Sequence, residues 1–133
     1  MKISKKIFSA ISAGELLDKI SILEIKKNKI KDKKKNNNIR NELSSLFITA
    51  KNNNLFAKKK ILKAYKNLKK INEKLWKIED EIRDCERNKD FSNKFILLAR
   101  AVYINNDHRA RIKNSINTFA GSTIKEEKSY KKY

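Results

Sequence analysis

The feature that most constrains the fold is a run of apolar side chains whose spacing alternates between three and four residues. The run comprises Leu68, Ile71, Leu75, Ile78, Ile82 and Cys85. This spacing is typical of a helix that packs along a partner helix. The 133 residues include no proline and only two glycines, whereas sheets and long loops use more of both. The fold class that we predict is therefore all-α.

A second long helix is predicted to fold back against the first. The first long helix spans residues 55–87, a tight turn follows at 88–91, and the return helix spans 92–120. Gly121 is a natural left-handed stop for the return helix. We expect an antiparallel long-helix hairpin with two further helices, which together form a three- or four-helix bundle.

The two further helices are predicted in the first half of the chain. Ser12 and Glu15 have the spacing of a capping box, with Ser12 accepting from the backbone and Glu15 reaching back, at the start of a helix over 13–31. A shorter helix is expected over 39–51. The chain then forms one helical domain over 1–133, with an N-terminal extension (1–11), Lys/Asn-rich linkers (31–38 and 52–56) and a tail (122–133). The linker at 31–38 is expected because its dense lysines repel one another.

The helix over 13–31 has apolar residues on two sides, with Leu16 and Ile20 on one and Ile22 and Ile25 on the other. Such a helix is sandwiched, either within the fold or at an interface, so a homodimer is one expectation. No apolar run is long enough to span a membrane. The single Cys85 excludes an internal disulfide and fits a reducing, cytoplasmic location, and its place on the contact face favours burial.

The formal net charge of +19 bears on possible partners. Most of the basic residues are lysines, and Lys, Asn and Ile all have A/T-rich codons, so base composition accounts for part of this charge. Two lysine runs, over 26–35 and 58–70, are able to attract phosphates without sequence preference. Non-specific nucleic-acid binding is therefore one alternative function, although dedicated modules usually add arginines and interleaved aromatic residues.

Polar residues interrupt the apolar faces of the two long helices, and these form the candidate ligand-binding site. They are Asn72, Glu79 and Arg83 on the first long helix and Arg100, Asn106, Asp107, Arg109, Lys113 and Asn117 on the second. Polar groups on a face suited to burial need partners, because an unpaired buried polar group costs about 1–3 kcal/mol.

Two interpretations of this polar face stay open. In the first interpretation, opposite charges such as Glu79 and Arg100 pair with one another and fix the register of the helices. In the second, Arg109 and Lys113 hold an anionic group while asparagines orient it. Trp76, at the edge of the face, is either a core aromatic or a stacking surface for a sugar or base.

A possible carboxylate cluster, Glu15, Asp18 and Glu24, borders apolar surface on the helix over 13–31. Together with Glu79 and Asp80, these groups suggest an enzyme in which Mg²⁺ is held against a nucleotide phosphate, as in all-α nucleotide pyrophosphohydrolases. The E-E-x-x-E and E-x-x-D pattern of those enzymes is not reproduced. Mg²⁺ is expected only under this enzyme alternative, and the sequence leaves the cofactor otherwise unknown. The lone His108 excludes a metal site built from several histidines, and its position predicts an ordinary surface histidine.

Several stretches together resemble an uncharacterised family of short bacterial and phage proteins, a domain of unknown function. The stretches are Gly14–Ile20 with Ile22–Lys26, Asn72–Arg83, Phe95–Asn117, and Gly121–Tyr130 with its Glu126-Glu127-Lys128-Ser129 segment. The resemblance implies no established activity. Members of that family are often encoded near surface-glycan or glycosyltransferase genes, so the resemblance weakly implies a role in glycan or nucleotide-sugar metabolism.

The function that the sequence favours is that of an accessory protein which binds an anionic ligand, phosphorylated or nucleotide-sugar-like, and the resemblance implies surface-glycan metabolism as its setting. The Mg²⁺-dependent nucleotide-processing enzyme and the nucleic-acid binder are the alternatives.

Overall fold

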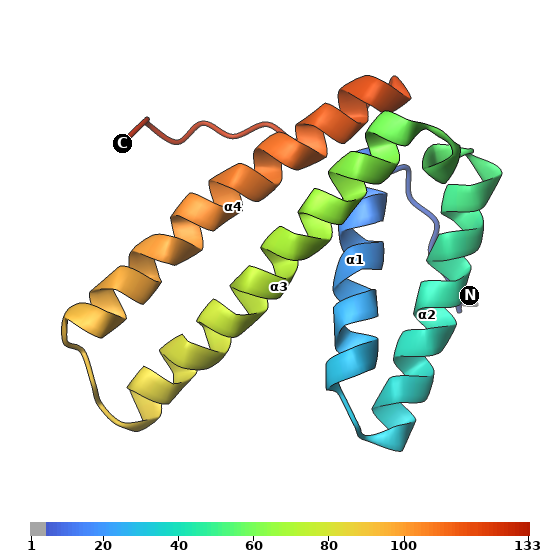
Figure 1. The fold of residues 1–133 in the computed structure, drawn as a ribbon. Coiled ribbons are helices and arrows are strands. Elements are labelled where there is room, and N and C mark those ends of the chain that lie inside the picture. Colours follow the sequence, from blue (N-terminus) through green and yellow to red (C-terminus); the bar gives the residue numbers. More distant parts are fainter. Residues whose placement is uncertain (1–4) are drawn as a thin grey trace, which may run out of the picture.

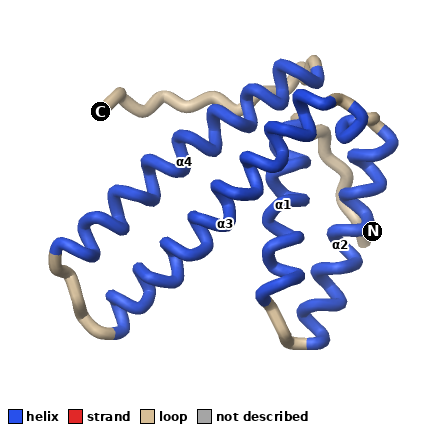
Figure 2. Tube along the Cα trace, viewed as in Figure 1, coloured by secondary structure: helices blue, strands red, loops and turns tan. Residues whose placement is uncertain are grey.

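A computed structural model describes residues 5–133, and in this range the chain is all-α. It contains α1 (Ala13–Lys29), α2 (Lys33–Asn52), α3 (Lys59–Arg87) and α4 (Asn93–Ala120), with a short 3-10 turn at Leu55–Ala57. Figures 1 and 2 show these helices and no strand in the described range. The predicted all-α class and four-helix arrangement are confirmed. Residues 1–4 of the predicted N-terminal extension lie outside the described residues.

The four helices form two antiparallel hairpins, α1–α2 and α3–α4 (Figure 1). Helix α1 contacts α2 on one side and both α3 and α4 on the other. The two hairpins meet near the start of α1 and diverge toward their tips (Figure 1). The two apolar sides of α1 are thus sandwiched within one chain, and the homodimer stays a prediction.

The core is concentrated where the hairpins meet. Its largest completely buried apolar side chains are Leu17, Ile20, Ile61, Leu68 and Ile116. In the first turns of α4, Phe95, Leu98 and Val102 are only half-buried, in the part of the α3–α4 hairpin that extends away from α1. Cys85 is buried, as predicted.

The prediction of a lysine-rich linker over 31–38 is wrong for most of its length, since α2 already begins at Lys33. Capping accounts for the difference. The Asp32 side chain accepts from the backbone N–H of Lys35 at 2.9 Å. The Asn36 amide donates to the carbonyls of Lys27 and Ile30 at the end of α1, at 2.9 and 3.0 Å. These bonds stabilise both helix ends, while water screens the repulsion between exposed lysines.

The other helix boundaries shift by a few residues. Asn52 still belongs to α2, so the predicted 52–56 linker shortens to a turn around Asn54, which has a left-handed backbone (φ 54°). Helix α3 starts at Lys59 rather than at residue 55, because the 3-10 turn precedes it. Helix α4 ends at Ala120, and the left-handed φ of 68° at the next residue, Gly121, matches the predicted stop.

No helix within residues 5–133 is long and apolar enough to cross a membrane.

Candidate functional site

Side chains of α4 and of the residues that follow it complete the start of α1. The Ser12 hydroxyl accepts from the Glu15 N–H at 3.1 Å, which confirms that half of the predicted capping box. Asn117 Oδ1 accepts from the Gly14 N–H at 2.6 Å, and Ser122 Oγ accepts from the Ala13 N–H at 3.0 Å. These bonds satisfy N–H groups that have no partner within a helix, so they fix α1 against α4.

A buried polar chain then connects α1, α3 and α4. The Asn72 amide nitrogen donates to Asp18 Oδ1 at 2.9 Å and to Ser21 Oγ at 2.7 Å. Its oxygen accepts from the Arg109 guanidinium at 3.3 Å. Asp18, Ser21 and Asn72 are all buried, and Arg109 is half-buried. Asn72 therefore links a buried carboxylate to a cation on another helix.

Lys113 lies at the centre of a second group, which we call the Lys113 cluster: Glu15, Asp18, Lys113 and Glu126. The Lys113 ammonium lies 2.8 Å from Glu15, 2.9 Å from Glu126 and 3.8 Å from Asp18. The Lys113 side chain is only 8% exposed. The capping box predicted that the Glu15 side chain reaches back to residue 12. In the structure it pairs with Lys113 of α4 instead.

The electrostatics of the cluster keep its groups charged. Burial by itself lowers the pKa of Lys113, but hydrogen bonds to Glu15 and Glu126 and the charge of Asp18 more than offset burial and leave that pKa raised. The hydrogen bond from Lys113 is the main reason that the pKa of Glu126 is lowered, and the charges of Lys113, Lys128 and Arg109 lower it further. Arg109 and Lys113 thus both act on the Glu126 carboxylate.

An open cleft of about 570 Å³ lies beside this network, and we call it the central cleft. Helix α1 lines it with isoleucines, α4 lines it with polar residues, and α3 supplies both kinds. The cleft is lined by Ile22, Ile25, Asn72, Leu75, Trp76, Glu79, Asp80, Arg83, Asn106 and Arg109. The half-buried Trp76 lies in this lining, so its indole is available to a ligand as well as to the core.

The predicted polar residues divide into three groups. Asn72, Glu79, Arg83, Asn106 and Arg109 line the central cleft. Lys113 and Asn117 are buried beside it and hold α1. Arg100 and Asp107 lie elsewhere.

Arg100 is exposed, and Glu79 pairs with Arg83 at 2.5 Å one turn along the same helix, so the suggested Glu79–Arg100 pair is not formed. Asp107 faces the tail, where its hydrogen bond is the main cause of the raised pKa of Tyr133. His108 is exposed, as predicted.

The three carboxylates predicted on the helix over 13–31 do not gather at one point. Glu15 and Asp18 meet at Lys113, but Glu24 accepts from Tyr65 and pairs with Lys69 at 2.8 Å. Within residues 5–133 no group of three or more His, Cys, Asp or Glu side chains is arranged to hold a metal ion. The positive charge that lies among Glu15, Asp18 and Glu126 is the Lys113 ammonium.

Sequence reasoning missed Ser21, Ser122 and Glu126 as members of this network. Ser21 follows Asp18 by three residues on a helix, so helical projection would have placed them together. Glu126 falls in a segment without periodicity, and only the family-like Glu126-Glu127-Lys128-Ser129 segment pointed to it.

A model of a family of unknown function, DUF6165, matches residues 7–133. The chain belongs to this family. The match spans α1 to α4 and the tail, so the whole of the central cleft and the Lys113 cluster falls within the family's extent. No curated protein and no solved structure matches the chain.

Proposed function

We propose that this DUF6165 protein binds an anionic small ligand, phosphorylated or nucleotide-sugar-like, in the central cleft, and acts as an accessory protein in the cytoplasm. Surface-glycan metabolism is the setting that the family resemblance suggests for this role.

The state of Arg109 carries the proposal. Three carboxylates lie within 4 Å of the Lys113 ammonium and balance its charge. Arg109, in contrast, has no carboxylate within ion-pair distance among residues 5–133. Its one hydrogen bond is to the neutral Asn72 amide at 3.3 Å. A half-buried guanidinium with spare donors on the wall of an open cleft suits a phosphate or carboxylate, which it can bind through two parallel hydrogen bonds.

The rest of the cleft suits a ligand that has a flat or apolar part. Trp76 and the isoleucines of α1 offer an apolar wall, on which a sugar or base can stack. Asn106 offers amide donors and an acceptor, and Glu79 and Asp80 offer acceptors for hydroxyl groups. This combination favours a phosphorylated sugar or nucleotide over a bare inorganic anion.

The alternatives receive less support from these contacts. In a Mg²⁺-dependent nucleotide-processing enzyme the carboxylates would have to leave Lys113 before they were able to hold a metal ion. Nucleic-acid binding through the lysine runs rests on exposed lysines of α1, α2 and α3, and would be independent of the cleft.

The test compares Arg109→Gln with the unaltered protein, using calorimetric titration with UDP-glucose, UMP and inorganic phosphate as probes. Glutamine retains a donor for Asn72 while it removes the charge. We expect at least one organic probe to bind, and Arg109→Gln to weaken that binding by about tenfold or more, because charge-assisted hydrogen bonds to the anion are lost.

Arg100→Gln is the matched control, since it makes the same charge change at an exposed position of the same helix outside the cleft. Circular dichroism establishes that each variant is folded. Equal losses in Arg109→Gln and Arg100→Gln would reduce the effect to net charge and refute the cleft. Absence of binding by all three probes would also count against the proposal.

A further inference from the structure

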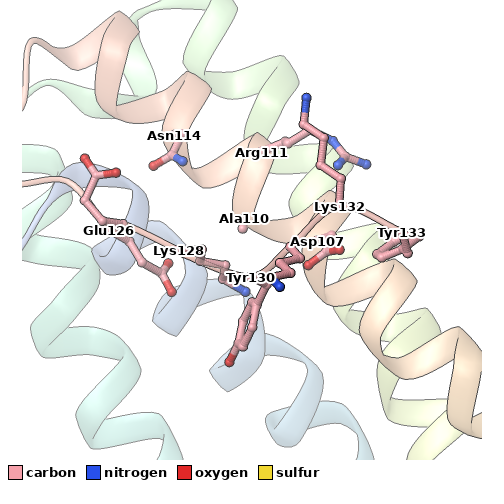
Figure 3. A pocket seen from close by; sticks show the side chains of 11 residues that line it. Asp107, Ala110, Arg111, Asn114, Glu126, Lys128, Tyr130, Lys132 and Tyr133 are labelled. Atoms are coloured by element: carbon pink, nitrogen blue, oxygen red, sulfur yellow. The ribbon is translucent and has the colours of Figure 1, made fainter.

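The tail, residues 122–133, is attached to the helices at three points. Ser122 bonds the start of α1, Glu126 pairs with Lys113, and the Tyr133 ring packs edge-on against Tyr103 of α4 with ring centres 5.3 Å apart. Figure 3 shows the tail side chains next to Asp107, Ala110, Arg111 and Asn114 of α4, around a hollow of about 560 Å³. The tail therefore lies along α4 without being part of a helix.

Glu126 is the dispensable partner of Lys113. An ammonium has three donors; Glu15 of α1 accepts from one at 2.8 Å, and the Asp18 charge lies 3.8 Å away, and neither depends on the tail. Glu126 is a third carboxylate around one ammonium, and its side chain is 42% exposed. Its departure leaves Lys113 hydrogen-bonded to Glu15 at 2.8 Å, with the Asp18 carboxylate 3.8 Å away, and frees the donor that Glu126 had used.

Arg109 and Lys113 are four residues apart on α4, and side chains at this spacing are neighbours on one face of a helix. Asn72 and Asp18 connect these two cations. Asn72 is hydrogen-bonded to both Arg109 and Asp18, and Asp18 lies 3.8 Å from Lys113. The Glu126 carboxylate therefore lies within the field of two cations, one of which faces the central cleft.

We infer that Glu126 occupies a second anion subsite, and that on its release Lys113 and Arg109 together bind the two phosphoryl groups of a diphosphate diester. This inference rests on the proposed function and names its ligand class and its control by the tail. One singly charged phosphoryl group takes the place of Glu126 on Lys113, and the other lies on Arg109.

Charge decides between a diester and a terminal phosphate. Each phosphoryl group of a diphosphate diester carries one negative charge, as the Glu126 carboxylate does, so the exchange leaves the charge beside Glu15 and Asp18 unchanged. A terminal phosphate carries close to two charges at neutral pH and adds repulsion from those two carboxylates.

The test titrates the full chain and two single-site variants, Glu126→Gln and Glu127→Gln, with UDP-glucose and with UMP in a calorimeter. Both variants raise the net charge by one, but only Glu126 contacts Lys113. We expect Glu126→Gln to bind UDP-glucose about tenfold more tightly than the unaltered chain, and Glu127→Gln to match the unaltered chain within about twofold. UMP, with one phosphoryl group for Arg109, gains little in either variant.

Equal gains in affinity for UDP-glucose in Glu126→Gln and Glu127→Gln, or no gain in either, would overturn the role of the tail. The proposed function would still stand in that case if binding depended on Arg109. A gain for UMP as large as that for UDP-glucose would overturn the diphosphate assignment. Failure of both probes to bind every variant would remove the proposed function and this inference together.

Discussion

At the scale of single residues, the junction between α1 and α4 depends on the absence of a side chain at residue 14. A Cβ atom at Gly14 would lie 2.4 Å from the Lys113 carbonyl oxygen and 2.8 Å from Asn117 Oδ1. The first contact is too short for any side chain unless the α4 backbone moves, and the second unless the Asn117 side chain moves. The Gly14 N–H also donates to that same Asn117 oxygen, so contact and hydrogen bond depend on one close approach.

Gly14→Ala is expected to lower the free energy of unfolding by about 1–3 kcal/mol, the usual cost of overpacking a tight contact. Urea unfolding followed by circular dichroism measures the change. Gly121→Ala is the comparison, because nothing lies within 4 Å of a Cβ there and only the left-handed backbone opposes alanine, at about 1 kcal/mol. If Gly14→Ala proved no more destabilising than Gly121→Ala, the close approach would be wrong.

The sequence predicted part of the site at this scale, because helical projection places residues of one helix on a common face. It put Asn72, Arg109 and Lys113 on facing sides of two helices, and the structure joins them in one network. It did not predict that carboxylates from α1 and the tail would surround Lys113. Those pairings depend on how α1 crosses α4, which no periodicity within one helix encodes.

At the scale of secondary structure elements, a hydrogen-bonded trio joins α1 to α3. The Tyr65 hydroxyl donates to Glu24, and Lys69 pairs with the other Glu24 oxygen at 2.8 Å. Burial alone raises the pKa of Glu24, but the hydrogen bonds from Lys69 and Tyr65 more than offset burial and lower that pKa. For Tyr65, burial first and the Glu24 hydrogen bond and charge next all raise the pKa far above 10.

These shifts predict that the Tyr65 contribution to stability is lost at alkaline pH. In the unfolded chain Tyr65 releases its proton near pH 10, whereas in the folded chain it keeps the proton, so its contribution is full below about pH 10 and falls above it. The difference in unfolding free energy between the unaltered chain and Tyr65→Phe should therefore shrink progressively as the pH rises above about 10. Urea unfolding at several pH values measures it.

Tyr103→Phe serves as the comparison, because Tyr103 is exposed. A Tyr65→Phe difference that changes with pH no more than the Tyr103→Phe difference would contradict the raised pKa of Tyr65.

The helices themselves were mostly predictable, since hydrophobic spacing fixes their existence and Gly121 fixes one end. Residues 33–38 are helical although lysine repulsion predicted a linker there. The Asp32 and Asn36 side chains form capping hydrogen bonds, each of which acts across only a few residues. Short-range hydrogen bonds outweighed a diffuse, solvent-screened repulsion there.

At the scale of the whole molecule, a net charge of +19 acts against a small core. Positive charges repel one another more strongly in the compact state than in the expanded chain. The repulsion reaches across the molecule at low ionic strength, where the screening length is about 30 Å at 0.01 M, and weakens at 0.1 M, where it is about 10 Å.

The melting temperature is therefore expected to rise by several degrees when NaCl increases from about 0.01 to 0.1 M, and further at higher salt. Differential scanning calorimetry measures the change. Sodium fluoride should give the same rise as sodium chloride at equal ionic strength, because screening does not depend on the identity of the anion. A fall in the melting temperature with either salt would show that attractive ion pairs outweigh the repulsion.

The two ends of α3 differ in sign: lysines without any acid fill its first turns, and acids predominate from Glu73 to Glu86. Because the acid-rich end lies toward the tip of the α3–α4 hairpin, away from α1, the opposite charges are held a long way apart on a stiff rod. Helix α3 consequently has an electric moment along its axis. Beside a large polyanion it experiences a torque that turns its basic end inward before any contact forms.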